Sequence, residues 1–175
     1  MGFWEIHPDS DAYRVLKDLT ADEEWWLDFR FKWGATIGDA WPEVHVKVLG
    51  GKKRHGDFPS FLGIPIFSER ALKLLLPLIR DSIEVLPLMC ETENLFAINV
   101  VRVMDCLDHD LSEFEKFSDG RIMRVENYVF KEHCLDGVHI FKIPEQLNNR
   151  QYVSDTFKTL VEESGLKGML FDQIA

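Results

Sequence analysis

Apolar and polar residues alternate in two segments of the first third of the chain. Phenylalanine and tryptophan alternate with arginine and lysine over residues 29–33, and valine alternates with histidine and lysine over residues 44–48. A period of two places successive side chains on opposite faces of a strand, so both segments are predicted to be half-buried strands. Residues 2–6 predict an opening strand, and Gly50 and Gly51 are expected to end the strand at 44–48.

A longer apolar segment, residues 96–104, has mostly apolar side chains on both alternating faces, with Asn99 and Arg102 as exceptions. This pattern is typical of a strand that is covered on both sides, so we predict that it is the central strand of a sheet. Other strands are predicted at residues 64–67, 122–130, 138–143 and 168–174, and a turn at Asp136 and Gly137 separates the second and third of them.

Two predicted helices begin in the same way, with a serine followed by an acidic residue. Ser68 and Ser154 are expected to accept hydrogen bonds from the first free N–H groups, and the acid is favourable in the first turn. The apolar positions expected to face inward are Leu72, Leu75, Leu76 and Ile79 in the first helix and Phe157, Leu160 and Val161 in the second. Pro77 predicts a kink or an end near Leu76, and Gly165 predicts the end of the second helix.

Shorter helical segments are predicted at residues 10–19 and, from the capping-box sequence Thr-Ala-Asp-Glu, at residues 20–23. Strands in succession with a few inserted helices are typical of the α+β class and not of a doubly wound α/β fold. The 175 residues contain no repeat or long linker. We therefore predict a single α+β domain over residues 1–175, with a mostly antiparallel or mixed central sheet and a few packed helices.

The charge of the chain bears on its partners. Thirty acidic residues against twenty lysines and arginines give a formal net charge of -10. Contact with nucleic acid requires a basic surface, so we expect no nucleic-acid partner and consider a basic protein partner more plausible than an acidic one. No export signal or membrane-spanning run is evident. Cys90, Cys106 and Cys134 are widely spaced and odd in number, which favours a reducing, cytoplasmic location.

The strongest candidate for chemistry is a cluster directly after the predicted central strand, formed by Asp105, Asp108, His109 and Asp110. Carboxylates and an imidazole at a strand end could serve a metal-dependent or acid-base hydrolase. The spacing matches neither an EF-hand loop nor a two-histidine zinc motif, and aspartates are also common in ordinary turns. We therefore expect no catalytic residue, metal or other cofactor, and keep the hydrolase as an alternative.

The same cluster belongs to a wider acidic segment, residues 105–119, in which six acids accompany one lysine. This segment is either a solvated loop or a docking surface for a basic protein. Adjacent Trp25 and Trp26 are a second candidate for contact, because two neighbouring tryptophans cannot easily both be buried in one short helix. The candidate partner-binding residues are Asp105, Asp108, Asp110, Glu113, Glu115, Asp119, Trp25 and Trp26.

An ordered set of short motifs carries a family resemblance. These motifs are GDFPS, IPIFSERA, INVVRVMDCLD, SDGRIMRVENYVF, HIFKIP, YVSDTFK and GLKGMLF, from Asp57 to Phe171. In this order the chain resembles a bacterial immunity-protein family of polymorphic toxin systems, immunity family eleven, formerly a domain of unknown function. The resemblance implies a non-catalytic cytoplasmic protein that binds and neutralises a cognate toxin. A scaffold or oligomerisation domain is a further alternative, and the oligomeric state stays open.

Overall fold

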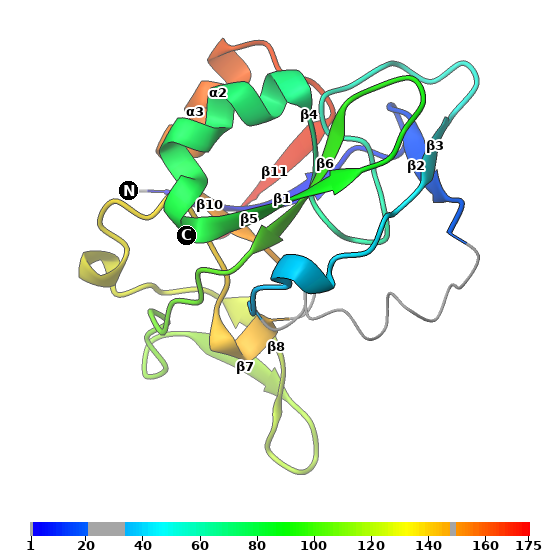
Figure 1. The fold of residues 1–175 in the computed structure, drawn as a ribbon. Helices are drawn as coiled ribbons and strands as arrows, with labels where there is room; N and C mark the ends of the chain where they lie inside the picture. Colours follow the sequence, from blue (N-terminus) through cyan, green and yellow to red (C-terminus); the bar gives the residue numbers. More distant parts are fainter. Residues whose placement is uncertain (1, 21–33, 148–149) are drawn as a thin grey trace.

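The computed structural model describes residues 2–20, 34–147 and 150–175 of the chain (Figure 1). The helices are α2 (Glu69–Ile79) and α3 (Asp155–Glu163), with short 3-10 turns at η2 (Gly38–Ala40), η3 (Arg80–Ser82), η4 (Glu132–Cys134) and η5 (Pro144–Gln146). The strands are β1 (Phe3–Pro8), β2 (Val15–Asp18), β3 (Val46–Leu49), β4 (Ile66–Ser68), β5 (Ile83–Leu88), β6 (Leu95–Val100), β7 (Glu113–Lys116), β8 (Ile122–Asn127), β9 (Ile140–Phe141), β10 (Tyr152–Ser154) and β11 (Met169–Gln173).

All pairs between the described strands are antiparallel, although isolated parallel bridges such as that of Val15 with Ser60 also occur, and the class is α+β, as predicted. In the described ranges they form four separate sheets, with the orders β11-β1-β10-β9, β4-β6-β5, β2-β3 and β7-β8, and not the single central sheet that we expected. The predicted central strand is β6, which lies between β4 and β5. None of the described helices is long and apolar enough to cross a membrane.

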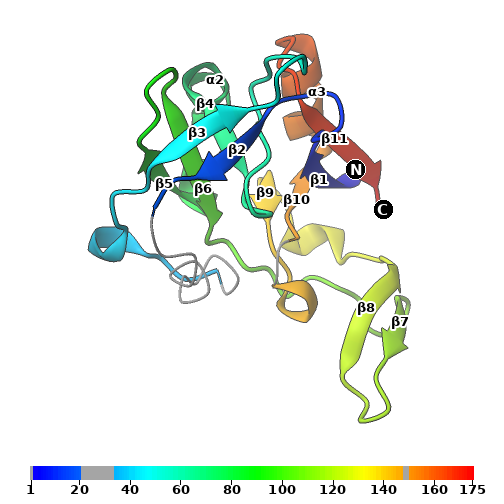
Figure 2. The ribbon, with the colours of Figure 1, turned by 90° about the vertical axis from the view of Figure 1, so that its right-hand side faces the viewer.

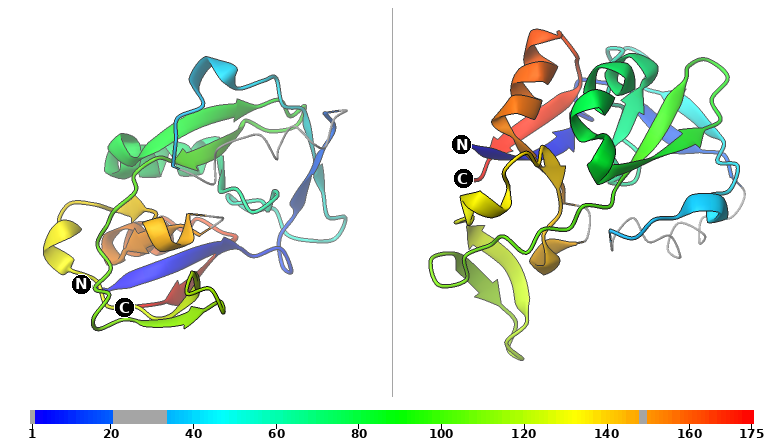
Figure 3. Two further views of the ribbon diagram at one scale, coloured as in Figure 1. Left: turned by 90° about the horizontal axis from the view of Figure 1, so that it is seen from below. Right: turned by 60° about the vertical axis from the view of Figure 1, so that its left-hand side comes forward.

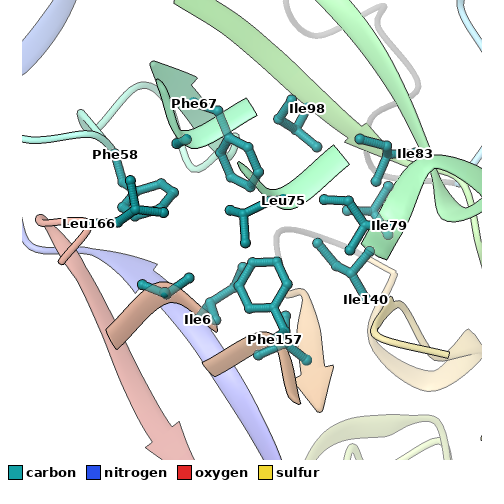
Figure 4. Packing of buried hydrophobic residues seen from close by; sticks show 14 residues of the cluster. Ile6, Phe58, Phe67, Leu75, Ile79, Ile83, Ile98, Ile140, Phe157 and Leu166 are labelled. Carbon is teal, nitrogen blue, oxygen red and sulfur yellow. The ribbon is translucent and has the colours of Figure 1, made fainter. Parts of the chain in front are cut away.

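The main core lies where the two helices meet the two larger sheets (Figure 4). Leu75 and Ile79 of α2, Phe157 of α3, Ile6 of β1 and Ile98 of β6 are all at most 5% exposed and belong to one cluster. Because side chains from both sheets and both helices interlock there, removing one of these side chains would leave a cavity and cost about 2–5 kcal/mol. This core fixes the position of the rest of the chain.

Both helices begin as the sequence predicts. Ser68 Oγ accepts a hydrogen bond from the Ala71 N–H at 3.1 Å, and Ser154 Oγ accepts one from the Phe157 N–H at 3.3 Å. Each serine is also the last residue of a strand, so the same strand–serine–helix arrangement occurs twice. Gly165 follows α3 with a φ of 66°, a conformation that glycine adopts without strain.

The predicted helix at residues 10–19 is wrong. The Asp9 carboxylate accepts from the Ala12 N–H at 3.0 Å and closes a turn, after which the chain extends into β2. The Leu16 N–H donates to the Ser60 carbonyl at 2.8 Å, and all four residues of β2 pair with β3. Long-range pairing therefore overrides the local helical pattern.

Several predicted boundaries also change. Strand β6 ends at Val100 and not near residue 104, β8 ends at Asn127, and β9 contains only two residues. Helix α2 continues through Pro77 to Ile79, so it does not end near Leu76, which was one of the two outcomes predicted from Pro77. Pro77 has no backbone N–H to donate to the carbonyl of Lys73, which is four residues earlier. Because Lys73 and Pro77 are both exposed, water can donate to that carbonyl instead. The segments predicted at 20–23 and 29–33 lie almost entirely outside the described residues.

A second core cluster supports the other half of the molecule. Phe3, Phe130, Phe141 and Tyr152 pack their rings in mostly edge-on pairs with centroids 5.2 to 6.4 Å apart. Such aromatic pairs add about 0.5–1.5 kcal/mol each beyond the burial of their surface. This cluster lies at the base of the β7–β8 hairpin and holds it against the sheet that contains β1.

Candidate docking surface

The acidic segment 105–119 connects β6 to the β7–β8 hairpin and includes the whole of β7. The hairpin projects from the rest of the molecule, on the side opposite to α2 and α3 (Figure 1, Figure 2). The right-hand view of Figure 3 shows the same projection from a further direction. The segment therefore lies on a protruding part of the fold, where a partner could reach it.

Backbone hydrogen bonds anchor the segment at the base of the hairpin. The Asp108 N–H donates to the Val129 carbonyl at 2.8 Å, and the Val129 N–H donates to Ser112 Oγ at 3.0 Å. Leu107 forms a bridge with Phe130, and both side chains are buried in the second core cluster. The loop between Asp105 and Ser112 is thus tied to the core by both its backbone and its apolar side chains.

The carboxylates of the segment have different roles. Asp108 is half-buried, and its Oδ1 accepts from the N–H groups of Asp110 at 3.0 Å and Leu111 at 3.2 Å, so it caps the turn. Asp105, Asp110 and Glu113 are exposed, and no described residue forms an ion pair with them.

The two remaining acids have basic partners from β8 and its turn. Glu115 pairs with Arg124 at 2.8 Å. Asp119 accepts from the Arg121 main-chain N–H at 3.1 Å and from its guanidinium at 2.7 Å, and these two bonds lower the pKa of the Asp119 carboxyl. The count of charges over residues 105–119 does not include these two arginines, which lie just beyond the segment and pair with two of its acids. The exposed, unpaired negative charge of the segment therefore lies on Asp105, Asp110 and Glu113.

The side chains of the hydrolase alternative do not share a common site. Asp108 caps its own turn, and the His109 ring bonds to the Glu145 carboxylate from η5. Asp105 and Asp110 are exposed. Over residues 2–20, 34–147 and 150–175, no group of three or more histidine, cysteine or acidic side chains is placed to hold a metal ion.

A groove runs between the hairpin and η5, and the sequence analysis did not predict it. Its volume is about 350 Å³. The hairpin contributes Phe117, Ile122 and Met123, and the opposite wall is formed by the stretch from Pro144 to Leu147. Phe117 is 44% and Met123 45% exposed, although both are large and apolar. Their exposure follows from the projection of the hairpin, which no local sequence pattern indicates.

A buried polar network fixes the far wall of the groove. Gln146 Oε1 accepts hydrogen bonds from the Tyr128 hydroxyl at 2.6 Å and the Tyr152 hydroxyl at 2.7 Å. Burial raises the pKa of both tyrosines, so both stay protonated and continue to donate. Arg150, beside this network, donates to the Glu5 carboxylate at 2.7 Å. These hydrogen bonds attach η5 to the second core cluster through Gln146.

The second predicted contact region, Trp25 and Trp26, lies outside the described residues. Two other tryptophans of the N-terminal region have structural roles. The Trp4 indole donates to Asp155 at 2.8 Å and packs against the main core, and the Trp41 indole donates to the Pro87 carbonyl at 2.9 Å.

Comparison with known proteins adds one positive finding. Residues 10–175 match the model of a family described as the Immunity protein family (Imm11). No curated protein matches the chain. The matched range includes both helices, the hairpin and the groove.

Proposed function

Because the chain belongs to the Imm11 immunity protein family, we propose that it binds a cognate toxin and neutralises it by covering the toxin's functional surface. The observation that carries this proposal is the family match over residues 10–175. In this proposal the protein acts by stoichiometric binding, without catalysis, metal or cofactor. The toxin is a protein domain with a basic surface, and the encounter takes place in the cytoplasm.

The charge of the molecule supports a basic partner. A net charge of -10 attracts a basic protein over distances of about a Debye length, close to 8 Å at physiological salt. Attraction of this kind mainly increases the association rate and makes that rate sensitive to salt. Asp105, Asp110 and Glu113 are suited to this role because they are exposed and have no described basic partner.

The fold supports occlusion by a projecting element. The hairpin stands away from the two larger sheets, while its base is fixed by the second core cluster (Figure 2). A convex, anchored element is suited to block a concave site on another protein, since little of its backbone has to be ordered on binding. We therefore place the toxin contact on the segment 105–119 and the hairpin that it enters.

Co-expression tests the proposed function. The toxin domain encoded beside this protein's gene is expressed in cells with and without the protein, and the purified pair is run on gel filtration. We expect growth to be restored and a stable complex to elute ahead of either component. If growth is not restored and the two proteins elute separately, the immunity function is wrong.

A charge-neutral variant tests the role of the acidic segment. Asp105→Asn, Asp110→Asn and Glu113→Gln are combined, because these substitutions leave the capping carboxylate of Asp108 intact. We expect association with the toxin domain to slow and its salt dependence to flatten, with an unchanged melting temperature.

A matched control carries the same change in charge on other parts of the surface, with Asp11→Asn, Glu91→Asn and Glu163→Gln, all at exposed positions. Stopped-flow measurements at several salt concentrations compare the two variants. Equal association rates for both variants at low salt would show that the acidic segment does not steer the toxin.

A further inference from the structure

The tip of the hairpin has features of a binding anchor that the exposed acidic side chains do not have. Among the described strands, β7 and β8 pair only with each other and form a two-stranded sheet. A hairpin of this kind is only marginally stable without support. Here the base of the hairpin is supported, because Phe114 and Val125 pack into the second core cluster. Phe117 and Met123, near the tip, remain about 45% exposed.

The turn at the tip is already fixed in one conformation. The Phe117 N–H donates to the Arg121 carbonyl at 2.9 Å, and the Gly120 N–H donates back to the Phe117 carbonyl at 2.9 Å. The Arg121 guanidinium is held by Asp119 and lies 5.5 Å from the centre of the Phe117 ring. Because the ring is held before any partner arrives, binding through it loses little conformational entropy.

Phe117 and Met123 also line the same groove, whose volume of about 350 Å³ can accept one or two side chains of a partner. Pro144 and Leu147 on the opposite wall make both sides of the groove partly apolar. A fixed apolar site within a polar surface is the usual setting of the few residues that supply most of the affinity of an interface.

The charges around the groove indicate which partner fits. Its two guanidinium groups are already paired, Arg124 with Glu115 and Glu126, and Arg150 with Glu5. The Glu145 side chain is only 7% exposed; its Oε1 atom bonds to the His109 ring, and its Oε2 atom is buried without a hydrogen-bond partner among the described residues. Paired cations and an incompletely compensated carboxylate favour a ligand with positive charge.

We propose that Phe117, Met123 and the groove beside them form the main affinity site for the toxin, and that the groove binds a toxin segment in which an apolar side chain is flanked by lysine or arginine. This proposal rests on the proposed function and adds a division of roles. Asp105, Asp110 and Glu113 increase the association rate, whereas Phe117 and Met123 slow dissociation.

The test compares two double variants of the full chain. Phe117→Ala with Met123→Ala removes the exposed apolar atoms of the tip. Leu74→Ala with Leu170→Ala removes similar atoms from α2 and β11, where the two leucines are 39% and 48% exposed. Binding of the neighbouring-gene toxin domain is measured by surface plasmon resonance, and melting temperatures check that both variants are folded.

We expect the tip variant to bind about 30-fold more weakly or worse, mainly through faster dissociation, and the control to bind within about 3-fold of the wild type. A Phe117→Leu variant keeps an apolar side chain and should retain most of the affinity. If the wild type and the tip variant bind equally, the affinity site is elsewhere, although the immunity function stands. If the wild type itself does not bind the toxin domain, both proposals are wrong.

Discussion

The buried lysine at position 142 leads to a quantitative prediction about stability. Lys142 is 2% exposed, and its ammonium donates to the Leu147 carbonyl at 3.3 Å. The side chain borders a small cavity of about 10 Å³ that Ile98, Val100 and Gln151 also line. A strand pattern alone would place this lysine on an exposed face, so its burial is a feature of the tertiary structure. We consider the substitution Lys142→Met.

The expected change in the free energy of unfolding follows from the burial of the ammonium group. This burial lowers the pKa of Lys142 from 10.5 to about 8. At 1.36 kcal/mol for each pKa unit, keeping the ammonium charged inside the fold costs about 3 kcal/mol at pH 7. Methionine has a similar length and no charge, and the change also loses the hydrogen bond to the Leu147 carbonyl, worth about 1 kcal/mol. Lys142→Met should therefore raise the free energy of unfolding by about 2 kcal/mol at pH 7.

The pH dependence gives an independent check of the same reasoning. The unfolded chain binds the proton more tightly than the folded chain, so the penalty is fully present below pH 8 and is relieved as the pH rises toward 10.5. The free energy of unfolding of the wild type should therefore increase over this window. In Lys142→Met this contribution should be absent.

Urea unfolding at pH 7 and at pH 9.5 measures both effects. Lys131→Met, at an exposed lysine, is the matched control and should change the free energy of unfolding by less than about 0.5 kcal/mol. If Lys142→Met is less stable than the wild type at pH 7 and keeps its pH dependence, burial of the charge is not the dominant effect at this position.

Three further predictions concern other polar groups. Asp57 accepts hydrogen bonds from the Ser68 hydroxyl, the Arg70 guanidinium and the Lys167 main-chain N–H. Asp57→Ala should therefore lower the free energy of unfolding by about 2–4 kcal/mol in urea titrations, and an effect below about 1 kcal/mol would contradict this. Burial lowers the pKa of His139, so the free energy of unfolding should fall as the pH drops through about 6.5. His139→Gln should therefore show a smaller difference in melting temperature between pH 7.5 and pH 5 than the wild type. An unchanged difference would argue against this origin. Asp108→Ala should cost about 1 kcal/mol through loss of the turn cap, whereas Asp110→Ala should cost less than about 0.5 kcal/mol, and equal costs would mean that the cap contributes nothing.

Local patterns in the sequence predicted the elements that depend on local physics. The serine caps, the glycine after α3 and the strands β3, β6 and β11 follow from hydrogen bonding and periodicity within a few residues. Residues 10–19 show the limit of this reasoning, because their strand exists only through pairing with residues distant in the sequence. The division of the strands into four sheets depends on the same long-range contacts and could not be deduced from single segments.

For the candidate site, the sequence indicated the acidic segment but not its architecture. The count of acids in 105–119 identified exposed charge at Asp105, Asp110 and Glu113. It did not reveal that Asp108 is a structural cap or that arginines from β8 and its turn pair with the remaining acids. Nor did it indicate the exposure of Phe117, because no strand was predicted over residues 113–117 and the projecting hairpin is a feature of the tertiary structure.

Titration of the toxin tests the central claim most directly. The toxin domain encoded beside this protein's gene is mixed with increasing amounts of the protein, and the residual toxin activity is measured at equilibrium. Stoichiometric occlusion predicts that activity falls linearly and reaches zero near a fixed molar ratio, independent of incubation time. Activity that is unaffected by excess protein, or that is lost progressively with time at a small fraction of that ratio, would contradict neutralisation by binding.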